Sequence, residues 1–509
     1  MVLRERSPAK AKKGKGGAGA ADLIEPARTK RRSSKDANMH RNLQMRLRSL
    51  SVEDDQDFAM ILGGCGGMPM ATPVAKEKTV PARAADVEVE SEKPKISRIK
   101  SLSTFWRLHD GLEDWGYRNF PAITDSFNVL VYSLDLAVRS VRWFQFGIVA
   151  VCLGFRLFVY AIMLLPAFLK IFFAYYHDRR IQRRVRFGPA EREYLDIYIP
   201  EEALAAQKSG QPVPVVIAVM GGAFVIGHRG YNAQLGLRLM DFGVITVGID
   251  YRNFPRGQIP DMVEDVGRGV RWVFQNIHMY GGDPKNMMLV GQSAGAHLAA
   301  MLVLEHGLLQ AMDQANGGST GEARLPMLPR GHSGSGHDID AWSVSDLKCF
   351  LGVSGPYDLV KLGPHLASRG LYPRIVDHLT SGDVAGCSPE RLLETDDWKA
   401  HAGAVAELLP PIHLFHGYCD QAVPVWASSD FAERLREAGV ENVTLDLRKG
   451  MSHTYPVIEG PMQRHDPQVE LILPVLFGKG AQKRLEDSPK LPPMWPLRIL
   501  NVAGYINPF

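Results

Sequence analysis

Short apolar runs alternate with amphipathic stretches from about residue 190 onward. The first run, 191–200, alternates between apolar and polar residues, as a strand with one buried face does. Six later runs are mostly apolar, which is typical of strands buried on both faces of a parallel sheet. They cover residues 212–220, 244–251, 286–291, 349–354, 411–415 and 443–447.

Helical periodicity fills the gaps between these runs. It marks an apolar face in 262–277, in 422–438 and in 467–477. Strands and helices in alternation predict one α/β domain, placed at 184–480, with helices flanking a mostly parallel sheet. A segment rich in Gly, Ser and Pro, 313–341, is expected to be a surface insertion, followed after the domain by a C-terminal extension, 481–509.

A hydrophobic segment precedes this domain. Residues 144–169 include 15 Leu, Ile, Phe or Val and one interruption, Arg156. A single tilted transmembrane helix is compatible with this composition, because the apolar residues can outweigh the cost of one central Arg, about 3 kcal/mol. If the segment is divided at Arg156, each half is too short to span a bilayer, so a re-entrant hairpin, an interfacial helix and a buried core helix stay open.

We assign residues 101–183 to an amphipathic and hydrophobic membrane-associated region, with 144–169 as the candidate membrane segment. A cluster of Arg residues at 179–186 follows it, and the positive-inside rule places this end and the domain after it in the cytosol. Membrane lipids are therefore an expected partner.

Charge is distributed unevenly along the chain. The net charge is +4, but residues 1–50 contain 14 Lys or Arg and four Asp or Glu, which leaves −6 for the remaining 459 residues. Residues 1–100 have few aromatic side chains and cannot bury enough apolar surface to offset the entropy of ordering, so a disordered basic tail is predicted. Because no aromatic residues are interleaved with its charges, we expect it to meet anionic lipid or solvent and not nucleic acid.

Cysteine and histidine usage points away from disulfides and metals. The five cysteines are scattered, which fits a reducing compartment. They are Cys65, Cys152, Cys349, Cys387 and Cys419. The 16 histidines include no HExxH or other metal-ligand spacing, so no metal and no cofactor is expected.

The most informative motif is GQSAG at residues 291–295. It follows an apolar strand and begins a predicted helix, which is the context of a nucleophile elbow, where a sharp turn lifts the serine hydroxyl above the sheet. We therefore predict that Ser293 is a catalytic nucleophile. The alternative is an ordinary serine N-cap of a helix.

A nucleophilic serine needs a base and an acid that orients the base. Asp420 follows the strand at 411–415, and His453 follows the strand at 443–447. Both therefore lie at carboxyl ends of strands, where the sites of open α/β sheets are found, and the order Ser, acid, His is usual for the α/β-hydrolase fold. We predict Asp420 as the acid and His453 as the base.

Three other polar residues compete for these roles. Asp358 is the rival acid, for which a turn or capping role is the preferred interpretation. His416 precedes a glycine after a strand, and His297 lies one helical turn beyond Ser293. Both histidines are expected to be packed structural residues.

The developing oxyanion of an ester needs backbone N–H donors. The segment MGGAF at residues 220–224 follows a strand where esterases carry an HGGG-type motif. We predict that the donors are the amides of Gly222, Ala223 and Ala294, with Gly221 as a neighbouring candidate.

Together these motifs resemble the hormone-sensitive-lipase-like branch of the α/β-hydrolases and, more closely, the isoprenylcysteine methylesterases. The matching stretches lie within 185–478. They are GGAFVIGHRGYNAQLG, GIDYRNFPRGQIPDMVEDV, YGGDPKN, GQSAGAHLAA, GVSGPYDL, HLASRGLYPRI and the FHG…D…VP block. YRNFPxG and GQSAGAH are specific beyond GxSxG. That family does not require the His of HGGxW, so Met220 departs little from it, and Phe224 in place of Trp is a mild departure.

The resemblance implies hydrolysis of methyl esters of farnesyl- or geranylgeranylcysteine, small lipidic substrates, at endoplasmic reticulum or Golgi membranes with the catalytic domain facing the cytosol. Alternatives are a general carboxylesterase or lipase and an arylformamidase, which share the architecture. A non-catalytic receptor with a hydrolase-like fold is the alternative of another class, and the intact set of Ser293, Asp420 and His453 argues against it.

Overall fold

The computed structural model describes residues 148, 151–316, 342–369, 374–488 and 491–509. The predicted tail at 1–100 lies outside these ranges, as do most of 101–150 and most of the predicted insertion at 313–341.

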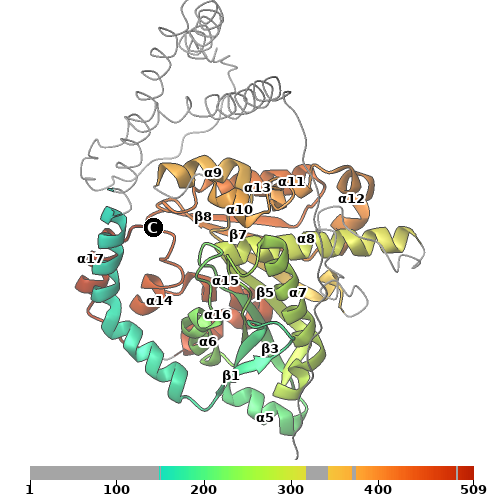
Figure 1. Ribbon diagram of the computed structural model, residues 1–509. Helices are drawn as coiled ribbons and strands as arrows, with labels where there is room; N and C mark the ends of the chain where they lie inside the picture. The colour runs from blue at the N-terminus through green and yellow to red at the C-terminus, as the bar shows by residue number, and fades with distance from the viewer. Residues whose placement is uncertain (1–147, 149–150, 317–341, 370–373, 489–490) are drawn as a thin grey trace, which may run out of the picture. The chain divides into compact units, whose positions relative to one another are not determined.

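An eight-stranded sheet forms the centre of the described chain (Figure 1), in the order β1-β2-β4-β3-β5-β6-β7-β8. The strands are β1 (Ile181–Arg186), β2 (Tyr194–Tyr198), β3 (Val213–Val219), β4 (Ile245–Ile249), β5 (Gly282–Gln292), β6 (Leu347–Val353), β7 (Ile412–Gly417) and β8 (Val443–Arg448). Strands β3 to β8 pair in parallel, and β1 and β2 add an antiparallel edge. The predicted mostly parallel sheet is confirmed. The Arg-rich strand β1 was not predicted, because its apolar pattern is weak and its pairing with β2 defines it.

Helices cover both faces of this sheet. Alternate residues of β3 explain why, since Ile217 packs into one core cluster and Val216 and Ala218 into the other. The first cluster includes residues of α5 (Glu201–Ser209), α7 (Ile259–Asn276), α8 (Ala294–Ala315), α9 (Leu359–Ser368), α10 (Ile375–Leu379), α11 (Pro389–Leu392), α12 (Asp396–Leu408) and α13 (Trp426–Glu437). The second includes residues of α6 (Ala233–Met240), α15 (Pro467–Phe477) and α16 (Ala481–Asp487). The three helices expected from periodicity correspond to α7, α13 and α15.

The hydrophobic segment forms one helix, Val151–His177, which is long and apolar enough to cross a membrane by length and composition. It continues without a break through Arg156, so the structure contains no hairpin at that residue, and it ends eight residues beyond the predicted segment. One face of the helix is buried against β1, β2, α6, α14 (Glu459–Gln463) and α17 (Leu497–Ile506). The helix therefore packs on the α/β body through a single stripe.

The interrupting Arg156 has a specific partner. Its guanidinium donates hydrogen bonds to the carbonyls of Ile506 and Asn507, at distances of 3.2 and 2.9 Å. The last carbonyls of a helix lack partners within the helix, so Arg156 completes the end of α17. The predicted C-terminal extension is thus part of the packed body.

Candidate active site

Ser293 lies in the tight turn between β5 and α8, with φ 55° and ψ −124°. This conformation is unfavourable for a residue with a side chain, and its flanking glycines are needed because backbone passes close to them. A Cβ on Gly295 would lie 2.1 Å from the carbonyl oxygen of Val219, and one on Gly291 would lie 2.5 Å from Cα of Ala296. The GxSxG pattern is therefore explained by the space available at this turn.

Three residues from distant parts of the chain meet above this turn. The Nε2 atom of His453 lies 2.8 Å from Oγ of Ser293, and its Nδ1 atom lies 2.7 Å from a carboxylate oxygen of Asp420. Because a carboxylate only accepts hydrogen bonds, Nδ1 carries the proton, which leaves Nε2 as the acceptor for the serine hydroxyl. All three side chains belong to the buried part of the protein, where few water molecules screen their charges.

The Asp420 carboxylate is held by four donors. One oxygen accepts the amides of Ala422 and Val423, at 3.0 and 2.8 Å. The other faces His453 and, at 3.1 Å, Nε2 of His416. Burial by itself would raise the pKa of Asp420, but the attraction and hydrogen bonds of the two histidines outweigh it and hold the pKa well below its usual range. Asp420 is therefore ionised at neutral and mildly acidic pH.

His416 is more closely connected to the site than the sequence indicated. It is fully buried, its Nδ1 lies 2.7 Å from the hydroxyl of Ser428, and its Nε2 lies 2.9 Å from the carbonyl of Val423. A proton on Nε2 is donated to both the Val423 carbonyl and the Asp420 carboxylate, and Nδ1 accepts a hydrogen bond from the Ser428 hydroxyl. His416 thus helps to hold the same oxygen of Asp420 that His453 contacts.

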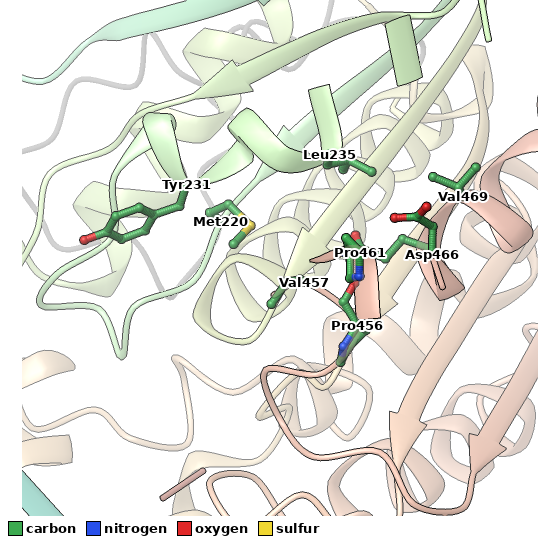
Figure 2. Close-up of a pocket in the computed structure, with 9 residues that line it drawn as sticks. Met220, Tyr231, Leu235, Pro456, Val457, Pro461, Asp466 and Val469 are labelled. Carbon is green, nitrogen blue, oxygen red and sulfur yellow. The ribbon is translucent and has the colours of Figure 1, made fainter. Parts of the chain in front are cut away.

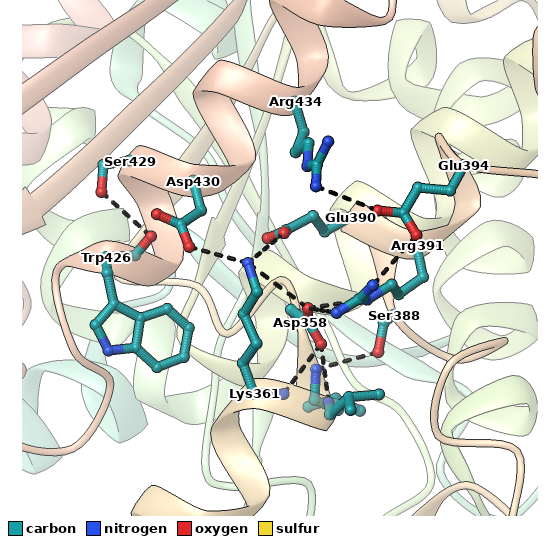
Figure 3. A network of polar contacts seen from close by, with 12 residues as sticks. Asp358, Lys361, Ser388, Glu390, Arg391, Glu394, Trp426, Ser429, Asp430 and Arg434 are labelled. Carbon is teal, nitrogen blue, oxygen red and sulfur yellow. Dashed lines mark hydrogen bonds and ion pairs between the residues drawn. The ribbon is translucent and has the colours of Figure 1, made fainter. Parts of the chain in front are cut away.

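The rival acid, Asp358, has the capping role that the sequence suggested. One carboxylate oxygen accepts the amides of Val360 and Lys361 at the start of α9, and the other pairs with Arg391 at 2.8 Å. Figure 3 shows that these contacts belong to a charged network. It joins α9, α11 and α13 through Lys361, Glu390, Arg391, Glu394, Asp430 and Arg434. The network fastens the helices beside the Asp420 loop to one another.

His297 is packed inside the protein, as expected. Its Nδ1 lies 2.6 Å from the carbonyl of Pro356, and its ring forms a T-shaped contact with the ring of Phe224. Burial lowers the pKa of His297 to about 4, so the ring is neutral at physiological pH.

The loop after β3 contains Gly221, Gly222 and Ala223, three of the four predicted oxyanion donors. Ala223 and Phe224 both have positive φ, 50° and 63°, which strains residues other than glycine. Gly222 has φ 136°, and a Cβ there would lie 2.5 Å from the amide nitrogen of Gly227. Within the described residues, the amides of Gly221, Gly222, Ala223 and Ala294 donate no hydrogen bond. Among the described residues, these four amides are therefore not engaged by a protein carbonyl, which the role of oxyanion donor requires.

Residues of the YRNFP motif hold this loop, a role that sequence reasoning did not assign. The Tyr251 hydroxyl donates to the Met220 carbonyl at 2.9 Å, and the Asn253 amide donates to the Gly227 carbonyl at 2.9 Å. The loop is thereby fixed at both ends. The YRNFP motif is specific to the resembling family, and this was the signal in the sequence that could have identified its role in holding the loop.

A small hollow of about 10 Å³ lies among the residues that Figure 2 labels. Its lining includes Met220, which precedes the oxyanion loop, and Pro456 and Val457, which follow His453 in the chain. Neither Ser293 nor His453 lines it, so it adjoins the loops of the site and is not the reaction chamber itself.

A polar cluster supports the His453 loop, and sequence reasoning missed it. The Asn507 side-chain amide, just after α17, lies 3.1 Å from the hydroxyl of Ser452, 2.6 Å from that of Thr454 and 2.7 Å from a carboxylate oxygen of Glu459. Burial raises the pKa of Glu459. The hydrogen bonds that Thr454 and Asn507 donate to its carboxylate lower the pKa, but by less than burial raises it. Asn507 therefore ties both chain neighbours of His453 to the C-terminal segment.

Metal ligands are not grouped in this part of the protein. Across the described ranges, no cluster of three or more His, Cys, Asp or Glu could hold an ion.

Burial raises the pKa of Cys349 and of Cys387 to about 12, so both thiols stay protonated and are poor nucleophiles.

The chain is similar to a group of plant proteins over most of its length. It is 33% identical to the probable isoprenylcysteine alpha-carbonyl methylesterase ICMEL1 of Oryza sativa subsp. japonica, over 75% of this chain and 80% of that protein. It is 34% identical to isoprenylcysteine alpha-carbonyl methylesterase ICME of Arabidopsis thaliana, over 69% of this chain and 75% of that protein. The chain belongs to the isoprenylcysteine alpha-carbonyl methylesterase family.

Other similarities place this family member among esterases more broadly. The BD-FAE family model matches residues 195–327. Esterase LipQ of Mycobacterium tuberculosis is 29% identical over 59% of this chain and 64% of that protein. The family member is a carboxylic ester hydrolase.

For this hydrolase we predict that Asn507→Ala lowers kcat by about 10-fold with little change in KM, because losing hydrogen bonds worth about 1 kcal/mol each loosens the His453 loop. The measurement is steady-state hydrolysis of a soluble aryl ester. Asn501→Ala, an exposed change on α17, is the matched control and should behave as the parent. Equal kinetics for the two variants would show that the Asn507 cluster does not position His453.

Proposed function

We propose that this chain removes the methyl group from isoprenylcysteine methyl esters, with Ser293 as nucleophile, His453 as general base and acid, and Asp420 as the orienting carboxylate. The observation that carries the proposal is the continuous contact from Ser293 Oγ through the His453 ring to the Asp420 carboxylate, 2.8 and 2.7 Å. These are the distances that proton transfer between a serine and an imidazole requires.

In the first half-reaction, His453 Nε2 takes the hydroxyl proton of Ser293 as Oγ attacks the ester carbonyl carbon. The carbonyl π electrons move to oxygen, and the amides of Gly222, Ala223 and Ala294, with Gly221 nearby, stabilise the oxyanion. Each such donor contributes about 3 kcal/mol of barrier lowering in comparable enzymes. Asp420 stabilises the imidazolium. The intermediate then expels methoxide, which takes the proton from Nε2 and leaves as methanol, so the serine is acylated.

In the second half-reaction, a water molecule gives its proton to His453 Nε2 and attacks the acyl carbon. A second oxyanion forms in the same cradle. When it collapses, the bond to Oγ breaks, Oγ regains the proton from Nε2, and the prenylcysteine leaves as a carboxylic acid.

Two observations favour a lipidic substrate. The relatives that cover most of the chain are named isoprenylcysteine methylesterases. The apolar helix Val151–His177 also reaches the catalytic loop, because the Tyr160 hydroxyl lies 3.5 Å from that of Thr454, the residue after His453. An apolar surface next to the base suits a substrate that partitions into lipid. We therefore place the reaction at a membrane surface, with the endoplasmic reticulum or Golgi and a cytosol-facing domain as the expected setting.

The test is to measure kcat/KM for farnesylcysteine methyl ester, for unprenylated cysteine methyl ester and for a short-chain aryl ester. We expect the farnesyl compound to exceed its unprenylated match by at least about 100-fold, because a prenyl group offers many buried carbons. Slow turnover of the farnesyl compound beside rapid aryl-ester hydrolysis would contradict the methylesterase proposal and favour a general carboxylesterase.

A further inference from the structure

The helix Val151–His177 carries two apolar stripes on opposite faces. The inner stripe is buried and consists of Tyr160, Leu164, Ala167, Ile171 and Tyr175. The outer stripe is exposed and repeats at alternating steps of four and three residues, in register with helical turns. It consists of Val151, Phe155, Phe158, Ile162, Leu165, Leu169, Phe172 and Tyr176. Phe155 is 67% exposed and Phe158 62%, which is unusual for adjacent turns of a helix whose other face is already packed.

Polar contacts fasten this helix to the hydrolase body along its whole length. Near the start, Arg156 bonds the end of α17. In the second half, the Lys170 ammonium donates to the Met494 carbonyl at 2.7 Å, and near the end the Tyr175 hydroxyl donates to Asp196 in β2 at 2.6 Å. Figure 1 shows the helix running along the edge of the body. The body therefore lies beside the helix and not only at one end of it.

This attachment is incompatible with a perpendicular membrane span. A helix of 27 residues is about 40 Å long and would cross the whole hydrocarbon layer, which is about 30 Å thick. The body would then enter the hydrocarbon with it, including the charged side chain of Asp196 and the polar cluster around Asn507. Charged groups and polar loops are excluded from lipid.

Charge at one end of the outer stripe matches a lipid surface. Arg179 and Arg183 are exposed immediately after the helix, whereas the exposed Arg184 and Arg186 lie over the ring of Tyr194 in β2. The guanidinium of Arg183 also stacks over the Tyr176 ring at 4.8 Å. Arginine and tyrosine together at the border of an apolar surface suit the headgroup layer of a membrane that contains anionic lipids.

We propose that helix Val151–His177 lies in the plane of a bilayer surface, with its outer stripe in one leaflet and Arg179 and Arg183 on anionic headgroups. The adjoining helix α17 also exposes Leu497, Val502 and Tyr505. The inference deepens the proposed function. Its biological purpose, the delivery of a lipidic ester to the site, rests on that function. Its geometry rests on the helix contacts alone.

Binding is tested by flotation of the full-length protein with phosphatidylcholine vesicles that contain or lack phosphatidylserine. The protein should float with the anionic vesicles and more weakly with the neutral ones. Phe155→Gln/Phe158→Gln should lower the partition coefficient by at least about 10-fold, because it removes two exposed apolar side chains from the lipid-facing stripe. Phe155→Leu/Phe158→Leu is the matched apolar control and should float normally. Unchanged hydrolysis of a soluble aryl ester shows that the variants fold.

Orientation is tested by the depth of spin labels on single cysteines at Phe155, Ile162 and Phe172, with Cys65, Cys152 and Cys419 replaced by Ser. In-plane binding predicts three similar, shallow depths, about 5–10 Å into the headgroup and acyl boundary. A deep label at Ile162 between two shallow ones would demonstrate a span and overturn the proposal. So would a stable dimer that buries the outer stripe without vesicle binding.

These outcomes are separate from the proposed reaction. If vesicle binding and shallow labels are found but farnesylcysteine methyl ester is not hydrolysed, the substrate assignment fails and the membrane surface stands. If the ester is hydrolysed but the labels are not shallow, the orientation fails and the substrate assignment stands.

Discussion

Ser293→Ala is expected to reduce kcat for every ester substrate by at least about 10⁴-fold, because the acyl-enzyme can no longer form. The free energy of unfolding should change by less than about 1 kcal/mol, since Ala adopts the same backbone and only one hydrogen bond, to His453, is lost. The measurements are steady-state hydrolysis of an aryl ester and chemical denaturation of both proteins.

A folded Ser293→Ala protein that retains more than a small fraction of the parent activity would contradict the assignment of the nucleophile. If Ser293→Ala loses both activity and stability, Ser293→Cys distinguishes a lost nucleophile from a lost fold. Cysteine has a similar size and places a different nucleophile at the same turn. The Cys variant should fold like the parent and show sluggish, alkylation-sensitive turnover.

Asp420→Asn is expected to lower kcat by about 10⁴-fold, because a neutral amide no longer holds the His453 tautomer or stabilises its cation. The loss should persist from neutral to mildly acidic pH, since the wild-type carboxylate, with its depressed pKa, stays ionised through this range. The measurement is the kcat profile against pH for the two proteins.

The rival carboxylate supplies the matched control. Asp358→Asn keeps a side-chain oxygen for the start of α9 but loses the ion pair with Arg391. We expect activity within about threefold of the parent and a destabilisation of about 1–3 kcal/mol. If Asp358→Asn were the inactive variant and Asp420→Asn the active one, the two acids would have to exchange roles.

The elements that the sequence predicted are those whose signals are local. Buried parallel strands produce continuous apolar runs, and a nucleophile turn requires small residues because backbone atoms lie within 3 Å of their Cβ positions. Asp420 and His453 could be chosen because they follow such runs directly. The structure then brings both to Ser293, from 127 and 160 residues away.

The features that the sequence did not predict depend on partners far along the chain. Composition alone left four interpretations of the hydrophobic segment, since it cannot say what covers each face of a helix. The partner of Arg156 lies 350 residues away, at the end of α17. Likewise, nothing near Asn507 in the sequence indicates that its side-chain amide lies beside the His453 loop. Strand β1 is defined by its pairing with β2 and not by an apolar pattern.

The most direct test of the central claim is the site of covalent modification by a fluorophosphonate ester analogue. Peptide mass spectrometry of the labelled protein should find one adduct, on Ser293. Labelling should be slowed by farnesylcysteine methyl ester, greatly slowed in His453→Ala and absent in Ser293→Ala, because the reagent requires the same activated hydroxyl as the ester. An unlabelled Ser293, or an adduct on another residue that tracks the activity, would contradict the account.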